Sequence, residues 1–142
     1  MVNDYKTLIE SLPGATSLAQ RRDGWWMTAP DLDVLEMARK MKEWKARFST
    51  MTGAMISENE TAVIYHFCLD CQAYNLKVYT KGNSLPSISN ILPAADWIER
   101  EIQDLYRVQF KDHPHPERLI RSLQTEPGLF REPGGAAGKS RR

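Results

Sequence analysis

Two cysteines three positions apart are the first residues in this sequence that could carry chemistry. Cys68 and Cys71 form a C-x-x-C pair, and His66 lies two positions before Cys68. A zinc or iron–sulfur site needs about four such ligands, and the sequence has no second cysteine pair to supply them. A thioredoxin-like redox pair lies at a helix N-terminus, and no helical pattern follows these cysteines. We therefore predict that this chain binds no metal or other cofactor.

Carboxylates and histidines gather later in the chain. On a helix, Glu99 and Glu101 point about 200° apart, so they cannot act as an acid–base pair on one substrate. His113 and His115 each precede a proline, and we expect them to shape a turn and to hydrogen-bond to a neighbour. The sequence contains no glycine-rich phosphate loop, HExxH or GxSxG motif. We predict no catalytic residue.

These carboxylates and histidines belong to residues 85–118, whose pattern predicts a helix between two extended stretches. Pro93 suits the first turn of a helix, where a missing N–H has no cost. Arg100 and Asp104 are four positions apart and are expected to pair across one turn. The apolar side chains recur at spacings of four and three and form one stripe: Ile98, Ile102 and Leu105.

The first half of the chain predicts two more helices and several strands. Asn3 or Asp4 can cap a short helix at residues 3–12. The Thr-Ala-Pro-Asp run at residues 28–31 predicts the start of a second helix, with Thr28 as its N-cap. Gly53 suggests a bulge or bend in its strand. Alternating, β-branched and aromatic residues predict strands at residues 24–29, 48–57, 61–69 and 74–80.

Together these elements predict an α+β fold: a small antiparallel sheet of about three to four strands packed with helices, then a helix and an extended C-terminal arm. We expect residues 1–112 to form a globular domain and residues 113–142 to form the arm. From residue 117 onward the chain has six basic and three acidic residues, a charge of about +3. It has few large apolar residues, so we expect it to be partly disordered or ordered by a partner.

Composition excludes several function classes. The net charge of +1 lacks the excess of positive charge that is typical of proteins that bind nucleic acid. No apolar run is long enough to span a membrane. We find no signal-peptide pattern, and two cysteines do not make a disulfide framework. The sequence therefore predicts a chain of a reducing compartment that reaches a membrane only through partners.

The run AADWIEREIQDLY at residues 94–106, followed by Phe110 and His113-Pro114, resembles a known signature. It is similar to that of the 30 kDa subunit family of respiratory complex I. This family includes the equivalent subunit of membrane-bound, energy-converting nickel–iron hydrogenases and formate hydrogenlyases. The preceding PSISNILPAA looks closer to the hydrogenase branch. Two glycines of the signature are replaced here, by Arg107 and by Asp112.

The resemblance implies a non-catalytic structural subunit on the cytoplasmic side of a membrane-bound electron-transfer complex. Its partners would be the large catalytic subunit, the small iron–sulfur subunit and a ferredoxin-like subunit, which would hold the nickel–iron or iron–sulfur centres. The arm would lie along the large subunit. The signature residues expected at the interface are Trp97, Glu99, Arg100, Glu101, Asp104, Leu105, Tyr106, Phe110, His113 and Pro114.

Three alternative functions stay open. The chain could be a true complex I subunit in NADH:quinone oxidoreduction rather than a subunit of a hydrogenase-like complex. It could be a small redox enzyme that uses Cys68 and Cys71. It could also be a free-standing adaptor with a basic tail, for which nucleic acid or anionic lipid would be the partner.

Overall fold

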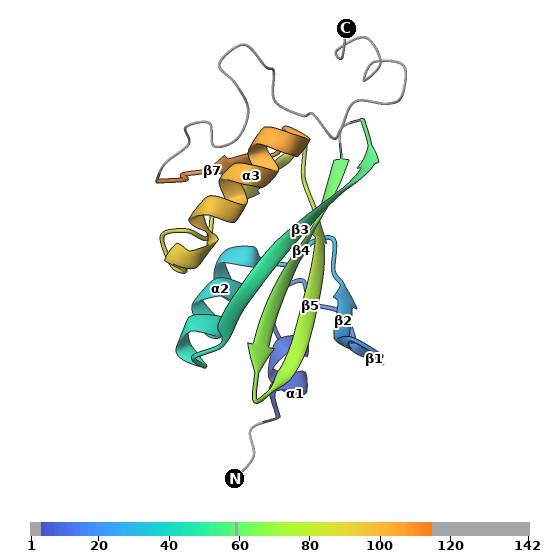
Figure 1. The fold of residues 1–142 in the computed structure, drawn as a ribbon. Coiled ribbons are helices and arrows are strands. Elements are labelled where there is room, and N and C mark those ends of the chain that lie inside the picture. Colours follow the sequence, from blue (N-terminus) through green and yellow to red (C-terminus); the bar gives the residue numbers. More distant parts are fainter. Residues whose placement is uncertain (1–3, 59, 115–142) are drawn as a thin grey trace, which may run out of the picture.

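A mixed sheet forms the centre of the computed structural model, which describes residues 4–58 and 60–114 (Figure 1). The strand order in the sheet is β1-β2-β5-β4-β3. Its five strands are β1 (Ala19–Arg21), β2 (Gly24–Thr28), β3 (Arg47–Ser57), β4 (Glu60–Leu69) and β5 (Gln72–Tyr79). All neighbours pair antiparallel except β2 and β5, which are parallel. The α+β class is confirmed, although the sheet has more strands than predicted and includes a parallel pair.

Three helices cover one face of this sheet. They are α1 (Tyr5–Glu10), α2 (Val34–Glu43) and α3 (Asp96–Tyr106). Side chains alternate between the two faces of a strand, so one face of β4 and β5 is apolar and packs against the helices. The fully buried side chains of this core include Ile9, Met37, Met41, Tyr65, Phe67 and Leu76. The other face carries no helix among the described residues.

The caps explain where the first two helices begin. Asp4 Oδ1 accepts a hydrogen bond from Thr7 N at 3.2 Å, as one of the two predicted caps of α1. The prediction that Thr28 caps the second helix was wrong. Thr28 is the last residue of β2, where it pairs with Lys77, and Asp33 caps α2 instead. Pairing with the sheet outweighs the local capping preference.

A second, two-stranded sheet closes the signature segment on itself. Strands β6 (Ser84–Pro86) and β7 (Gln109–Lys111) pair in parallel, so the two ends of the segment lie side by side. Between them the 3₁₀ turn η1 (Pro93–Ala95) leads into α3. The helix and the extended stretch before it were predicted, and β7 was not. The C-terminal arm lies outside the described residues, apart from His113 and Pro114.

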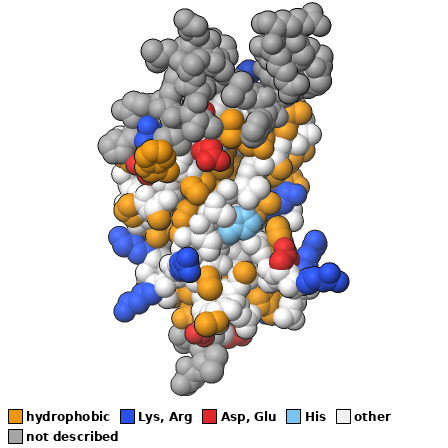
Figure 2. Space-filling view, in the orientation of Figure 1, with side chains coloured by type: hydrophobic (Ala, Val, Ile, Leu, Met, Phe, Trp, Pro, Cys, Tyr) orange, Lys and Arg blue, Asp and Glu red, His pale blue; other side chains and the backbone are white. Residues whose placement is uncertain are grey.

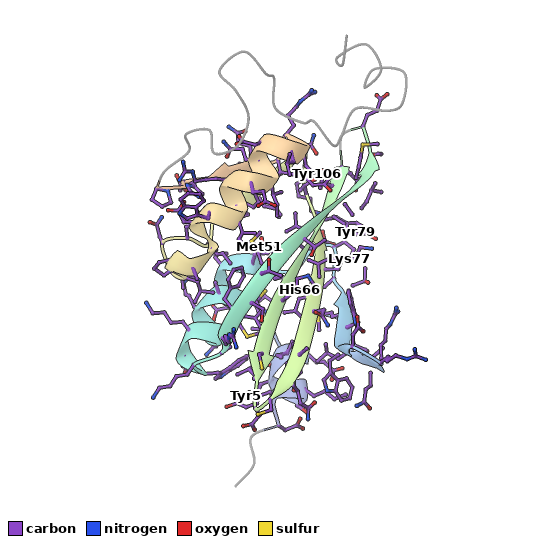
Figure 3. The ribbon with its side chains drawn as sticks, in the orientation of Figure 1. Tyr5, Met51, His66, Lys77, Tyr79 and Tyr106 are labelled. Carbon is purple, nitrogen blue, oxygen red and sulfur yellow. The ribbon has the colours of Figure 1, made fainter. Side chains whose placement is uncertain are left out.

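Gly53 has a different role from the bulge that its position suggested. It pairs in regular register with Val63, and the register shifts of β3 lie elsewhere. A Cβ at this position would lie 2.9 Å from two ring carbons of Tyr106. The glycine therefore gives α3 room to seat its last aromatic ring against β3. Figure 3 shows Tyr106 at the end of α3 that faces the sheet.

The two replaced glycines of the signature both lie where glycine is favoured. Arg107 ends α3 in the left-handed conformation with φ of 62°, and Asp112 after β7 also has φ of 62°. Glycine adopts this conformation without steric cost, whereas other residues are strained by about 1–2 kcal/mol. The glycines of the signature thus fit the left-handed backbone at these two positions. In this chain, Arg107 and Asp112 adopt that backbone conformation at a cost in stability.

We expect Gly53→Ala to lower the free energy of unfolding by about 1–2 kcal/mol, because the Tyr106 ring must move. In a Tyr106→Ala background the same change should cost nothing or stabilise the protein, since alanine is otherwise preferred to glycine in a strand. Urea unfolding of the four proteins of this double-mutant cycle measures the effect. An equal cost in both backgrounds would contradict the contact.

We expect Asp112→Gly and Arg107→Gly each to raise the free energy of unfolding by about 0.5–1 kcal/mol. Each substitution removes the steric strain of a non-glycine residue in the left-handed conformation. Thermal and urea unfolding provide the measurement. The matched control is Gln109→Gly, because Gln109 lies in the extended backbone of β7. This variant should be less stable than the parent protein. A loss of stability in all three variants would show that the left-handed residues are not strained.

Candidate functional site

The buried carboxylate of Glu99 is the centre of the signature segment. Glu99 is fully buried on the inner side of α3. Its Oε1 accepts hydrogen bonds from the hydroxyls of Ser87, at 2.6 Å, and Ser89, and its Oε2 accepts one from Ile88 N at 2.9 Å. One side chain thus satisfies three donors in the loop that follows β6.

His113 joins the same cluster from the other end of the segment. Its side chain is fully buried, and its Nε2 lies 3.6 Å from Glu99 Oε1. The same nitrogen lies 3.3 Å from the carbonyl oxygen of Asp96 and 3.5 Å from its Oδ1. The histidine therefore connects the chain after β7 to the first turn of α3, which agrees with its predicted role of shaping a turn and bonding to a neighbour.

Burial controls the electrostatics of this cluster. It raises the pKa of Glu99 above the ordinary 4.5, against hydrogen bonds from Ser87, Ser89 and Ile88 and the nearby His113, which lower it. Burial also raises the pKa of Tyr65 well above its ordinary value, with a smaller contribution from Glu99. The cluster holds three chain segments together, namely the loop after β6, α3 and the chain after β7.

The outer side of α3 presents a different set of side chains. Trp97 is 66% exposed, and the Arg100 guanidinium lies 5.5 Å from the centre of its ring. Arg100 Nη1 is 3.9 Å from Asp96 Oδ1, one turn before it, and the Arg100 side chain is 17% exposed. The pair of Arg100 with Asp104 stays a prediction. Glu101 is exposed on this side, so the two glutamates point apart as predicted.

The remaining signature residues divide between the inside and the surface. Asp104 is fully buried, Phe110 is buried in β7, and Leu105 is half-buried. Tyr106 packs over Gly53, and Pro114 is exposed. The segment thus brings Glu99 and His113 together inside, and leaves Trp97, Glu101 and Pro114 on the surface.

The sequence prediction did not include three residues of the buried cluster. Ser87 and Ser89 supply the hydroxyls that Glu99 accepts, and Asp96 contacts His113. A signal for the serines was present, since residues two apart in an extended stretch point to the same side. Only the tertiary structure shows that this side faces α3.

The cysteine pair lies in a hairpin and not beside a helix. Cys68 is half-buried on β4, and Cys71 is exposed in the turn between β4 and β5. Asp70 and Cys71 both have positive φ, as in the two-residue turns that join antiparallel strands. Within residues 4–58 and 60–114 no group of three His, Cys, Asp or Glu residues is arranged to hold a metal ion.

No helix among the described residues has the length and apolar character needed to cross a membrane.

Comparison with known families supports the resemblance carried by the signature. A sequence profile described as the 30 kDa subunit of respiratory-chain NADH dehydrogenase matches residues 27–129. NAD(P)H-quinone oxidoreductase subunit J of Synechococcus sp. (strain CC9605) is 57% identical over 37 residues, which are 26% of this chain and 20% of that protein. A subunit of the NADH-quinone oxidoreductase of Chelativorans sp. (strain BNC1) is 36% identical over 66 residues, 44% of this chain and 33% of the relative. The chain thus aligns with about a fifth to a third of these relatives' length.

Two solved structures share the fold. A trypsin-resistant fragment of Nqo5 superposes with a TM-score of 0.58 and 20% identity, over 72% of this chain and 90% of the fragment. A chain in the structure of the membrane-bound sulfane sulfur reductase, an archaeal respiratory membrane complex, gives a TM-score of 0.66 and 22% identity. That match covers 87% of this chain and 76% of the other.

We expect Glu99→Gln to remove part of the pH dependence of stability. Since burial raises the pKa of Glu99, the folded state binds this proton more tightly than the unfolded state. Its contribution to the free energy of unfolding is therefore greatest below the ordinary pKa of 4.5 and falls as pH rises to the raised value. Glutamine does not titrate, so this fall should disappear.

Urea unfolding between about pH 4 and pH 7 measures the difference between variant and parent. The control is Glu101→Gln, on the exposed side of α3, which should follow the parent at every pH. If the free energy of unfolding of Glu99→Gln changes with pH as that of the parent does, Glu99 does not have the raised pKa. Glu99→Ala should be more damaging, by about 3 kcal/mol or more, because it leaves three buried donors unsatisfied.

Proposed function

Since this chain belongs to the 30 kDa subunit family of respiratory-chain NADH dehydrogenase, we propose that it is a non-catalytic subunit that joins other subunits of a membrane-bound electron-transfer complex. The observation that carries the proposal is the exposed Trp97 on the outer side of α3. A large aromatic side chain left in water on a rigid helix is typical of a residue that packs against a partner.

The interior of the segment supports the same role. Glu99 and His113 fix the ends of the segment around α3, so that Trp97 and Arg100 are held in one arrangement before any partner binds. A surface that is already ordered loses less conformational entropy on binding. The buried cluster thus acts as a support for a docking helix.

The partners proposed are the large catalytic subunit and the small iron–sulfur subunit, with a ferredoxin-like subunit nearby. In this proposal they hold the nickel–iron or iron–sulfur centres, this chain holds none, and the complex attaches to the cytoplasmic side of the membrane. Trp97 and Arg100 contact the large subunit, and the arm after His113 continues along it.

Two kinds of complex fit this role. Residues 86–95 favour a hydrogenase-like complex because of their resemblance to that branch of the family. The relatives named as NADH-quinone and NAD(P)H-quinone oxidoreductase subunits favour complex I as the second candidate. Affinity purification of the tagged chain from its native membranes, with mass spectrometry and metal analysis, distinguishes them. Nickel together with iron supports the hydrogenase-like complex, and iron without nickel supports complex I.

We expect Trp97→Ala to weaken assembly without unfolding the chain. The exposed indole adds little to folding, so the free energy of unfolding should change by no more than about 0.5 kcal/mol. Loss of an interface aromatic should weaken association by about 2 kcal/mol, roughly thirtyfold. The amount of each partner that co-purifies from native membranes is the measurement, and Arg100→Ala should act in the same direction.

The matched control is Leu8→Ala, since Leu8 is also a large exposed apolar residue but lies on α1. It should assemble normally. Normal co-purification by Trp97→Ala and Arg100→Ala would reject the outer side of α3 as the docking surface. A tagged parent chain that purifies without any partner would reject the proposed function as a whole.

A further inference from the structure

The open face of the five-stranded sheet carries a groove whose lining is basic. The groove runs beside β1 and β2 and reaches β4 and β5. Its two charged side chains are Arg21 and Lys77, and no Asp or Glu lines it. The other lining residues are Thr16, Ser17, Ala19, Trp26, Thr28 and Ile64.

The sheet register explains why these side chains share one face. Trp26 and Thr28 on β2 lie opposite Asn75 and Lys77 on β5. Lys77 in turn lies opposite Ile64 on β4. Figure 3 shows His66, Lys77 and Tyr79 along these neighbouring strands. In Figure 2 the middle of the face is mainly orange and white around a pale blue histidine, with blue side chains on both sides.

Contacts within the groove hold its aromatic floor in place. The Trp26 ring meets His66 edge to face, with 6.3 Å between ring centres, and its Nε1 donates to Asp23 Oδ1 at 2.7 Å. The Arg21 guanidinium lies 6.0 Å from the same ring. An apolar centre with charged and polar groups around it, here including the Asp23 carboxylate, is a common composition of a protein interface.

We propose that this groove binds an acidic segment of a neighbouring subunit, as a second docking surface apart from the outer side of α3. The inference rests on the proposed function, because it takes the chain to be part of a complex. Carboxylates of such a segment would pair with Arg21 and Lys77, and the hydroxyls of Thr16 and Thr28 would lie beside them. Charge complementarity of this kind selects the partner and its orientation.

Charge also argues against two other occupants. The chain beyond residue 116 carries about +3, the same sign as the groove, so this chain's own C-terminal residues would be repelled. The same groove on a second copy is equally basic, so two copies cannot meet symmetrically through it. An acidic partner is the occupant that the groove fits.

The test uses the tagged full chain expressed in its native membranes. The double variant Arg21→Glu/Lys77→Glu should co-purify at least one partner about tenfold less than the parent. The control, Arg39→Glu/Lys42→Glu, makes the same charge change on α2, which packs on the opposite face of the sheet, and should assemble as the parent does. Circular dichroism and thermal unfolding confirm that both variants are folded.

A photoreactive amino acid at Thr28 identifies the occupant directly. We expect a crosslink to an Asp- or Glu-rich segment of another subunit, and we expect it to disappear in the Arg21→Glu/Lys77→Glu background. A crosslink only to residues 115–142 of this chain, to a second copy or to a lipid overturns the inference. So does normal assembly of the double groove variant.

Failure of this inference can be told apart from failure of the proposed function. If Trp97→Ala weakens assembly while the groove variant assembles normally, the groove has no partner and the role of α3 stands. If the parent chain brings down no partner at all, the complex itself is rejected, and the groove proposal with it.

Discussion

The buried carboxylate of Glu99 is the interaction on which the second half of this structure depends. Removing a carboxylate from water is costly unless its oxygens are hydrogen-bonded. Here the loop after β6 supplies two hydroxyls and one backbone N–H, and His113 approaches from the chain after β7. The hydrogen bonds offset the cost of burying the carboxylate only when β6, α3 and β7 are all in place. The Glu99 carboxylate thus couples three segments that lie apart in the sequence.

This coupling lets one short helix do two things. Its inner side carries the buried Glu99 and the apolar Ile102, and holds the segment to the sheet. Its outer side carries Trp97 and Glu101 in water. Because the inner side is fixed by directional hydrogen bonds rather than by apolar packing alone, the outer side is presented in one orientation. A docking element needs that property.

The sheet shows the same division between a packed and an open face. Every helix among the described residues packs on the face that carries Tyr65, Phe67 and Leu76. The open face is stabilised by its own side chains: His66 bonds to Asn75 at 2.6 Å and to Thr52 at 2.9 Å, across three neighbouring strands. Cross-strand polar pairs of this kind stabilise a sheet without an apolar cover. No helix among the described residues covers this face.

The sequence by itself determined the α+β class, the three helices and most strands, because hydrophobic period and capping are local properties. It also determined the family, through the run at residues 94–106. Only the tertiary structure decided that Asp33 rather than Thr28 begins α2, since pairing between β2 and β5 holds Thr28 in the sheet. It also decided that Gly53 makes room for Tyr106, and that Ser87, Glu99 and His113 meet. These contacts join distant residues, and no local pattern of residues encodes them.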